Sequence, residues 1–277
     1  MLGLRRLVRE ALAEDVGQGD VTTQSTVPKD ARCRVRLNAK QEGVLSGMEP
    51  FRTVFSALKS RLRQWEALED GAHFSAGDVL ATFEANTAAV LTGERVALNF
   101  VQRLSGVATL THRYVEAVNG LDTRICDTRK TTPLMRTLEK QAVMHGGGAN
   151  HRFALFDGVL VKENHIVAAG GVREALKKVI RGTHHLMKIG IEVKTLEEVK
   201  DALEAGADSI LLDNMSLDDM AEAVKLTKNH RVILEASGNV TLERVRAIAQ
   251  TGVHYISVGA LTHSAPAIDM SLLIENA

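Results

Sequence analysis

Basic side chains recur at three points between residues 127 and 165. They are Arg129 and Lys130, then His151 and Arg152, and finally Lys162 and His165. Arginine and lysine bind carboxylates and phosphates through charge-assisted hydrogen bonds. If these three points meet in space, they form a pocket for a ligand that carries several negative charges.

Two carboxylates and two glycine-containing turns follow later in the chain. Glu192 and Asp213 end successive apolar runs, and together they could share a Mg²⁺ ion, which favours a carboxylate or two plus phosphate oxygens. The turns Ser237-Gly238-Asn239 and Gly259-Ala260-Leu261 place backbone N–H groups near helix starts, where phosphate binds well. The residue types therefore indicate an anion clamp, a metal site and a phosphate site.

Each of these residues has an ordinary explanation when it is taken singly. Glu192 or Asp213 could be a surface or capping acid, and His151 could be a structural histidine. The triple glycine 146–148 could simply end a helix that begins at Pro133. A functional interpretation is favoured because the residues recur together at the ends of predicted strands.

The elements that must position them form a repeated pattern from residue 123 onward. Short apolar runs alternate with amphipathic helices, which predicts parallel strands joined by helices. The runs are 124–126, 158–161, 188–191, 209–212, 232–236 and 255–258, and they are followed by Asp127, Lys162, Glu192, Asp213, Ser237 and Gly259. In a β/α barrel the active site lies at the carboxyl ends of the strands. Six units are fewer than the eight of a closed barrel, so we expect an open or incomplete barrel.

The first third of the chain has a different pattern. Residues 2–14 predict an amphipathic helix, and 15–23 predict a capped loop. The alternation from Cys33 onward predicts a half-buried strand in an antiparallel sheet, with helices on one side. A long helix is expected after Asn86, and a second one between Gly106 and Gly120. Arg95 lies off the apolar stripe of the first of these, and local patterning favours a solvated side chain.

Composition limits the class of protein. The 277 residues contain 34 Lys and Arg and 34 Asp and Glu, so the formal net charge is zero. Broad attraction to nucleic acid or to membranes is therefore not expected. The two cysteines, Cys33 and Cys126, give neither a disulfide framework nor zinc-ligand spacing. No apolar run is long enough to span a bilayer, and we expect a cytoplasmic protein.

Long motifs in this order resemble one family. They are Asp127-Thr128-Arg129-Lys130-Thr131, Gly147-Gly148-Ala149-Asn150-His151-Arg152, Lys162-Glu163-Asn164-His165, Leu211-Leu212-Asp213-Asn214 and Leu234-Glu235-Ala236-Ser237-Gly238-Asn239. The early residues Asp15-Val16-Gly17 and the later Gly93-Glu94-Arg95 also fit. Over nearly its whole length the chain resembles the quinolinate phosphoribosyltransferases, which are carboxylating nicotinate-nucleotide pyrophosphorylases.

The resemblance implies a fold and a reaction. The fold is an N-terminal α/β sandwich over residues 1–106 and an incomplete α/β barrel over 107–264, with 265–277 packing back on the first domain. The reaction transfers phosphoribosyl from phosphoribosyl pyrophosphate to quinolinate with loss of CO₂, a step of NAD biosynthesis, with Mg²⁺ as the cofactor. The family forms homodimers or assemblies of dimers.

The resemblance also assigns roles to residues. Arg95 would be supplied across the dimer interface, against the local preference for a solvated side chain. Quinolinate would be held by Arg129, His151, Arg152 and Lys162, with Thr128 and His165 in the same substrate-binding set. Lys130, Glu192 and Asp213 are the candidate catalytic residues: Lys130 near the donor, and the two acids facing the ribose hydroxyls and Mg²⁺. The Ser237–Asn239 and Gly259–Leu261 turns would hold the ribose phosphate. One departure is Lys194, where family members often carry an acid.

Two other functions remain open from the residues themselves. A strand-end lysine such as Lys162 could form a Schiff base, as in a class I aldolase. Alternatively, the pocket could belong to a non-catalytic protein that binds an oxyanion or a phosphorylated metabolite. Turnover of quinolinate distinguishes both from the phosphoribosyltransferase.

Overall fold

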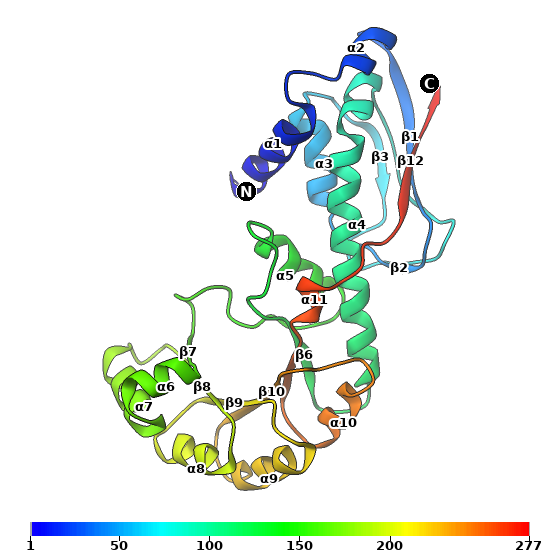
Figure 1. The fold of residues 1–277 in the computed structure, drawn as a ribbon. Helices are drawn as coiled ribbons and strands as arrows, with labels where there is room; N and C mark the ends of the chain where they lie inside the picture. The colour runs from blue at the N-terminus through cyan, green and yellow to red at the C-terminus, as the bar shows by residue number, and fades with distance from the viewer. Residues whose placement is uncertain (1, 277) are drawn as a thin grey trace. The chain divides into compact units, whose positions relative to one another are not determined.

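The computed structural model describes residues 2–276, and Figure 1 traces the chain. Its residues group into two compact units. The first contains the chain up to His112, the segment 132–147 and the residues from Ser264 onward; the second contains 113–131 and 148–263. The domain ranges 1–106 and 107–264 stay a prediction, and the contact-based units differ from them chiefly because 132–147 groups with the first unit.

The first unit is built on a four-stranded antiparallel sheet in the order β12-β1-β5-β3. Strand β1 (Arg32–Ala39) pairs with β5 (Val79–Asn86) on one side and with β12 (Met270–Asn276) on the other; β3 (Arg63–Ala67) completes the sheet. The predicted alternation in β1 is confirmed, because Cys33, Val35 and Leu37 are buried while Arg34 is exposed. The last strand in the chain therefore lies beside the first.

One face of this sheet is covered by helix α3 (Met48–Ala57) through aromatic side chains. Phe51 and Phe55 lie on α3, and their ring centroids are 6.1 and 5.4 Å from that of Phe83 on β5. All three side chains are fully buried. Such aromatic contacts contribute more to packing than buried area alone. The predicted strand near Gly43 is only the short β2 (Gly43–Val44), which pairs with β4 (His73–Phe74).

The N-terminal helix is confirmed as α1 (Leu2–Val16). The predicted loop over 15–23 is partly wrong, because a second helix, α2 (Val21–Thr26), begins within it. Asp20 caps this helix: its carboxylate accepts hydrogen bonds from the backbone N–H of Thr23 at 3.0 Å and from the Thr23 hydroxyl at 2.5 Å. The first backbone N–H groups of a helix have no partner within the helix, and an acidic N-cap residue accepts hydrogen bonds from them. Asp20 therefore marks the start of a helix as well as a turn.

The prediction of two helices divided at Gly106 is wrong. The chain forms one continuous helix, α4 (Thr87–Ala117). A Cβ atom at Gly106 would overlap the carbonyl oxygen of Pro266, which belongs to the same unit. Glycine is therefore needed inside this helix because another backbone segment passes against it, which is a packing requirement rather than a helix-ending signal.

The second unit contains the predicted parallel sheet. Its order is β6-β11-β10-β9-β8-β7, and every neighbouring pair is parallel. The strands are β6 (Arg124–Cys126), β7 (Val159–Val161), β8 (Ile189–Val193), β9 (Ser209–Asp213), β10 (Ile233–Ser237) and β11 (Tyr255–Ser257). All six predicted strands are present. Because β6 and β7 lie at opposite ends of this order and do not pair with each other among the described residues, the sheet does not close into a barrel there.

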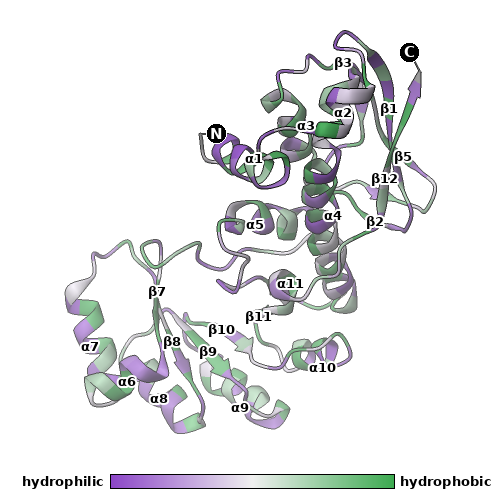
Figure 2. Ribbon diagram, turned by 45° about the horizontal axis from the view of Figure 1, so that its top comes forward, coloured by the Kyte–Doolittle hydropathy of each residue, from purple (hydrophilic) through white to green (hydrophobic). Residues whose placement is uncertain are grey.

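Helices line the outer side of the parallel sheet (Figure 1). They are α6 (Glu163–Ala169), α7 (Val172–Gly182), α8 (Leu196–Glu204), α9 (Leu217–Thr227) and α10 (Val245–Gln250). The helices α6 and α7 had not been predicted. Figure 2 shows hydrophilic and hydrophobic residues interspersed along α7 and α8, as expected where one helix face packs and the other is solvated.

Helix starts in this part of the chain follow from capping residues. Thr195 accepts a hydrogen bond from the N–H of Glu198 at 3.2 Å to start α8, and Ser216 starts α9 in the same way. Helix α5 (Arg136–His145), in the first unit, begins three residues after Pro133 because Leu134 has a left-handed φ of 64°. None of the helices within residues 2–276 combines the length and the apolar character that a membrane crossing requires.

Candidate active site

A cavity of about 360 Å³ lies at the carboxyl ends of the parallel strands in the second unit. The predicted basic and hydroxyl residues that line it are Thr128, Arg129, Lys130, His151, Arg152 and Lys162. The other predicted residues that line it are Glu192, Asp213, Ser237, Gly238 and Asn239. The strand ends that carry these side chains therefore meet, as parallel strands in one curved sheet should.

The buried carboxylate of Asp127 joins two segments of the basic group. A parallel bridge pairs Cys126, at the end of β6, with Ala149, so residues 149–152 continue beside this edge strand. Asp127 is completely buried, and its Oδ1 accepts the backbone N–H of His151 at 2.9 Å. This explains how residues more than 20 positions apart in sequence come to line one cavity.

Arg152 shows most clearly that the cavity suits an anion. Its Nη1 donates to the carbonyl oxygen of Gly158 at 2.7 Å, which fixes the side chain. Its Nε is buried and has no hydrogen-bond partner among residues 2–276. Burial and the neighbouring Arg129 guanidinium lower the pKa of Arg152, while Asp157 opposes this. A ligand carboxylate would satisfy the buried N–H group and offset the repulsion between the two guanidinium groups.

The hydrogen bonding of His151 fixes where its ring proton lies. Its Nδ1 accepts the backbone N–H of Arg152 at 2.8 Å. A backbone N–H can only donate, so Nδ1 is unprotonated and the proton is on Nε2. His151 is therefore neutral while this bond holds. It was predicted as part of a basic group, but in this arrangement it offers a hydrogen-bond donor instead of a positive charge.

Lys162 and Glu192 form an ion pair across neighbouring strands. Lys162 follows β7 and Glu192 lies on β8; their Nζ and Oε2 atoms are 3.3 Å apart. Lys194, the departure from the family pattern, pairs instead with Glu163, with Nζ and Oε2 2.7 Å apart. Hydrogen bonding to Glu163 is the main reason that the pKa of Lys194 is raised. Its ammonium is thus bound outside the Lys162–Glu192 pair.

The turn after β10 is interlocked with the end of β9. The backbone N–H of Asn214 donates to the carbonyl oxygen of Ser237 at 2.9 Å, and its side-chain Nδ2 donates to Asp213 at 3.0 Å. Asn239 Nδ2 donates to the Asn214 side-chain oxygen at 3.0 Å. Gly238 has a φ of 96°, and a Cβ there would overlap the Asn214 side chain. Asn214 therefore positions both Asp213 and the predicted phosphate-binding turn.

The turn after β11 lies against Lys130. A Cβ atom at Gly259 would be 3.1 Å from Cδ of Lys130. The Thr262 hydroxyl, on the short helix α11 (Ala260–His263), donates to the carbonyl oxygen of Lys130 at 2.8 Å. This turn therefore fixes the backbone of Lys130 and packs against its side chain, which lines the cavity. Gly259 itself is absent from the cavity lining.

Four other predicted residues do not line the cavity. Ala260 and Leu261 belong to helix α11, and the Leu261 side chain is completely buried. His165 caps helix α6, because its Nδ1 accepts the backbone N–H of Lys162 at 2.9 Å. Arg95 is an exposed residue of α4 in the first unit. The role of Arg95 at a subunit interface stays a prediction.

Two carboxylates in the cavity are available to a divalent cation, since Glu192 and Asp213 both line it. Within residues 2–276 there is no group of three or more His, Cys, Asp or Glu side chains that could hold a metal ion. Zinc is typically enclosed by three or four protein ligands, whereas Mg²⁺ often has one or two carboxylates plus substrate oxygens. The residues present fit Mg²⁺ held jointly with a phosphorylated substrate.

Glu235 is the main lining residue that sequence reasoning missed as a site residue. It is on β10, and its side chain is only 13% exposed. Burial raises the pKa of Glu235 to about 7, while the nearby Ser257 hydroxyl lowers it and the Asp127 carboxylate raises it further. A usable signal was present: Glu235 interrupts the apolar run of a strand predicted to be buried. Asn214 and Ser257 also line the cavity without having been predicted to.

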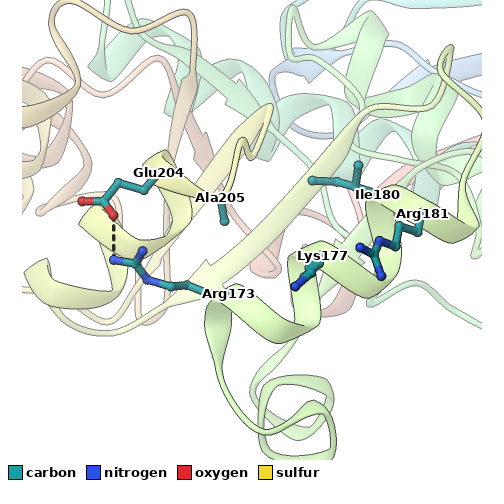
Figure 3. Close-up of a pocket in the computed structure, with 6 residues that line it drawn as sticks. All are labelled: Arg173, Lys177, Ile180, Arg181, Glu204 and Ala205. Atoms are coloured by element: carbon teal, nitrogen blue, oxygen red, sulfur yellow. Dashed lines mark ion pairs between the residues drawn. The ribbon is translucent and has the colours of Figure 1, made fainter.

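A second cavity of about 350 Å³ lies between helices α7 and α8. Figure 3 shows Arg173 reaching across to Glu204, with Lys177 and Arg181 on the same helix as Arg173. The Arg173 guanidinium is 2.7 Å from both Glu204 and Asp201. These are surface ion pairs with limited energetic value, and the cation most suited to an anion is already paired. This cavity is therefore not the substrate site.

Family models match almost the whole chain. The model described as the quinolinate phosphoribosyl transferase N-terminal domain matches residues 20–105, and the C-terminal domain model matches residues 107–273. The chain belongs to the quinolinate phosphoribosyltransferase family. The resemblance inferred from the motifs is thereby confirmed.

Individual relatives agree with the family match. The chain is 43% identical to a probable nicotinate-nucleotide pyrophosphorylase (carboxylating) of Bacillus subtilis, over 98% of this chain and 93% of that protein. It is 42% identical to quinolinate phosphoribosyltransferase (decarboxylating) 2, mitochondrial, of Nicotiana glauca, over 98% and 82%. The solved nicotinate-nucleotide pyrophosphorylase of Francisella tularensis superposes with a TM-score of 0.93 at 39% identity, covering 99% of this chain and 96% of that one. The predicted α/β fold class is confirmed.

Proposed function

We propose that this protein transfers the phosphoribosyl group of phosphoribosyl pyrophosphate to quinolinate, with decarboxylation. The products are nicotinate mononucleotide, pyrophosphate and CO₂. The observation that carries the proposal is that Arg129, Lys130, Arg152 and Lys162 line the same cavity as the carboxylates Glu192 and Asp213. Family membership over both domains supports the same reaction.

The cationic side chains address the first difficulty of this reaction. Quinolinate is a dianion, and the phosphoribosyl donor carries still more negative charge, so the two repel each other. Arg129, Arg152 and Lys162 would bind the quinolinate carboxylates, with the His151 Nε2–H group as a further donor. Lys130 would lie toward the donor. Holding both reactants in one orientation removes much of the entropic barrier.

The carboxylates of Glu192 and Asp213 would act on the ribose ring during the transfer. As the bond from ribose C1 to pyrophosphate breaks, positive charge develops on the sugar ring, and the pyridine nitrogen attacks C1. Glu192 and Asp213 would stabilise that charge through the ribose hydroxyls. They would also hold the Mg²⁺ that we propose as cofactor. When bound, this ion neutralises charge on the departing pyrophosphate.

The turn at the end of β10 would hold the ribose phosphate, and the turn after β11 would support it indirectly by positioning Lys130. Residues 237–239 line the cavity, and the Asn214 network fixes their backbone. Backbone N–H groups in turns with left-handed residues, such as Gly238 and Asn239, form concave anion sites. The late strands of β/α barrels are also where phosphate commonly binds.

Decarboxylation follows from the charge on the product ring. After transfer the ring nitrogen is quaternary and positively charged. The bond between the adjacent ring carbon and its carboxylate breaks, CO₂ leaves, and the electron pair stays on the ring carbon beside the cationic nitrogen. That carbon then takes up a proton. No covalent bond to the protein forms, so positioning and electrostatics account for the rate.

The experiment is to incubate purified protein with quinolinate, phosphoribosyl pyrophosphate and Mg²⁺. We expect nicotinate mononucleotide and CO₂ in equal amounts, and loss of both when a chelator removes the metal. Nicotinate in place of quinolinate is the matched control, since it lacks the carboxylate that leaves. Absence of product at high protein concentration would contradict the proposal.

The aldolase alternative has little support from the structure or the family. Nζ of Lys162 is engaged by the Glu192 carboxylate at 3.3 Å, and both family models that match the chain describe a phosphoribosyltransferase. Borohydride trapping with a carbonyl substrate would detect a Schiff base.

We also propose that the protein is cytoplasmic and forms a homodimer in which Arg95 is shared between subunits. Analytical ultracentrifugation tests the dimer. Recovery of activity on mixing inactive Arg95→Ala and Arg129→Ala chains tests the shared arginine.

A further inference from the structure

Glu235 lies on an interior strand of the parallel sheet, where it lines the cavity. Its strand, β10, is between β9 and β11, and it is in register with Leu211 on one side and Tyr255 on the other. Its side chain lines the cavity yet is only 13% exposed. Any ligand that fills this cavity therefore approaches a carboxyl group that has little access to water.

One oxygen of this carboxyl group lacks a partner. Oε1 of Glu235 is buried and accepts no hydrogen bond from residues 2–276. Oε2 is 3.7 Å from Nε2 of His151, which is beyond hydrogen-bonding distance. A buried polar atom without a partner is costly, and native proteins usually satisfy such atoms with a ligand or water. The arrangement indicates that Glu235 contacts what binds in the cavity.

The surroundings of Glu235 favour a neutral carboxyl group. Burial is the main cause that raises its pKa to about 7, Ser257 lowers it, and the Asp127 carboxylate raises it. His151 faces it as a neutral ring, because its Nδ1 is occupied by the N–H of Arg152. The other charged groups that line the cavity are Arg129, Lys130, Arg152, Lys162, Glu192 and Asp213. A dianion placed among these groups would oppose ionisation of Glu235 further.

We propose that Glu235 is an additional substrate-binding residue, which takes up a proton as quinolinate binds and donates an O–H hydrogen bond to it. This rests on the proposed function, since it names the ligand of the same cavity. An ionised Glu235 would repel the substrate carboxylates, whereas a protonated one replaces repulsion with a hydrogen bond. The proton comes from solvent, and no bond other than O–H is made or broken.

The proposal makes a distinction between two similar variants. In Glu235→Gln the amide is neutral at every pH and can donate a hydrogen bond, so it mimics the protonated acid. In Glu235→Ala the donor is lost. Wild-type affinity for quinolinate should fall up to tenfold per pH unit above about pH 7, because binding then requires proton uptake. Glu235→Gln should lack that decline.

The test is calorimetric titration of quinolinate into the full-length protein in HEPES and in Tris at about pH 8, two buffers that differ in ionisation enthalpy and contain no phosphate to compete for the cavity. The difference between the two buffers gives the number of protons taken up. Wild type should take up close to one proton, and Glu235→Gln should take up markedly fewer while binding at least as tightly. Glu235→Ala should bind more weakly, with circular dichroism to confirm folding. Glu197→Gln, an exposed acid on α8, is the matched control and should behave as wild type.

Two results would overturn the inference. One is undiminished proton uptake in Glu235→Gln; the other is binding by Glu235→Gln that is tenfold weaker than wild type at about pH 8, since the ionised carboxylate would then be the required form. The proposed function fails separately. Wild-type protein that binds quinolinate with proton uptake but forms no nicotinate mononucleotide would retain this inference and exclude the reaction.

Discussion

The Lys162 ammonium lies 3.3 Å from the Glu192 carboxylate, which links the carboxyl ends of the neighbouring strands β7 and β8. Lys162 is about half exposed, whereas Glu192 is largely buried. The pair joins a residue of the proposed quinolinate clamp to one that faces the proposed ribose and metal site. A substitution at Lys162 is therefore expected to affect donor binding as well as quinolinate binding.

Replacement of Lys162 should separate electrostatic from covalent chemistry. Lys162→Met removes a cation that contributes on the order of 1.5–3 kcal/mol to binding an anion, so the KM for quinolinate should rise roughly 10- to 100-fold. Lys162→Arg should retain part of the activity, because charge is kept. Complete inactivity of the arginine variant, with borohydride trapping in wild type, would instead support a Schiff base. Steady-state kinetics with each substrate varied provides the measurement.

Arg152→Ala should impair quinolinate binding more than donor binding. The variant loses the buried Nε–H group and the bond from Nη1 to Gly158. We expect the KM for quinolinate to rise about 10- to 100-fold, with a smaller change for phosphoribosyl pyrophosphate. Arg152→Lys should recover little, since lysine lacks the planar fork. Arg231→Ala, at an exposed position, serves as the control; equal effects on both substrates would argue against a quinolinate-specific role.

Gly238→Ala should damage the site more than its backbone strain alone explains. Both Gly238 and Gly206 have left-handed φ angles, 96° and 85°, but only at Gly238 would a Cβ meet another side chain, that of Asn214. Gly206→Ala should cost about 1–2 kcal/mol of stability and leave kcat unchanged. Gly238→Ala should in addition lower kcat/KM for the phosphoribosyl donor, because the turn and Asp213 move. Similar kinetics in the two variants would refute the role of the Asn214 network.

Gly106→Ala should destabilise the protein although it lies inside a helix. Alanine is normally favoured over glycine there by about 1 kcal/mol. At Gly106 the added methyl group would overlap the Pro266 carbonyl oxygen, and we expect a net loss on the order of 1–3 kcal/mol. Gly182→Ala in α7, where a Cβ meets nothing within 4 Å, should be neutral or stabilising. Urea unfolding of both variants measures the difference.

Glu235 should also make stability depend on pH. Folding raises its pKa from 4.5 to about 7. An acid whose pKa is raised contributes stability below the unfolded value and loses it as pH rises through the folded value. Wild type should therefore lose up to about 3 kcal/mol relative to Glu235→Gln between about pH 5 and pH 8. Melting temperatures of both proteins across this range test it; parallel curves would show that Glu235 ionises normally.

The sequence predicted the parallel sheet and its functional edge because both depend on local pattern. Each strand is a short apolar run that ends in a polar residue, and Lys162, Glu192 and Asp213 all stand at such ends. Parallel strands necessarily bring those ends to one edge. Functional residues at the carboxyl ends of parallel strands can therefore be located from sequence without knowing how the helices pack.

The errors arose where distant contacts decide the local structure. Gly106 looks like a helix terminus because glycine is a poor helix former, but its true cause, the Pro266 backbone, is 160 residues away in sequence. Asp20 was interpreted as part of a loop when it caps a helix. The electrostatics of Glu235 and the protonation of His151 depend on neighbours from other strands, so residue type alone could not indicate either.

The lack of pairing between β6 and β7 among the described residues has a mechanical consequence. Arg129 follows one edge strand, β6, and Lys162 follows the other, β7, yet both line one cavity. A dicarboxylate bound to both would act as a crosslink where hydrogen bonds between strands are missing. Bound substrate would then resist separation of β6 from β7. Substrate should therefore slow amide hydrogen exchange in β6 and β7 by a larger factor than in the interior strand β9.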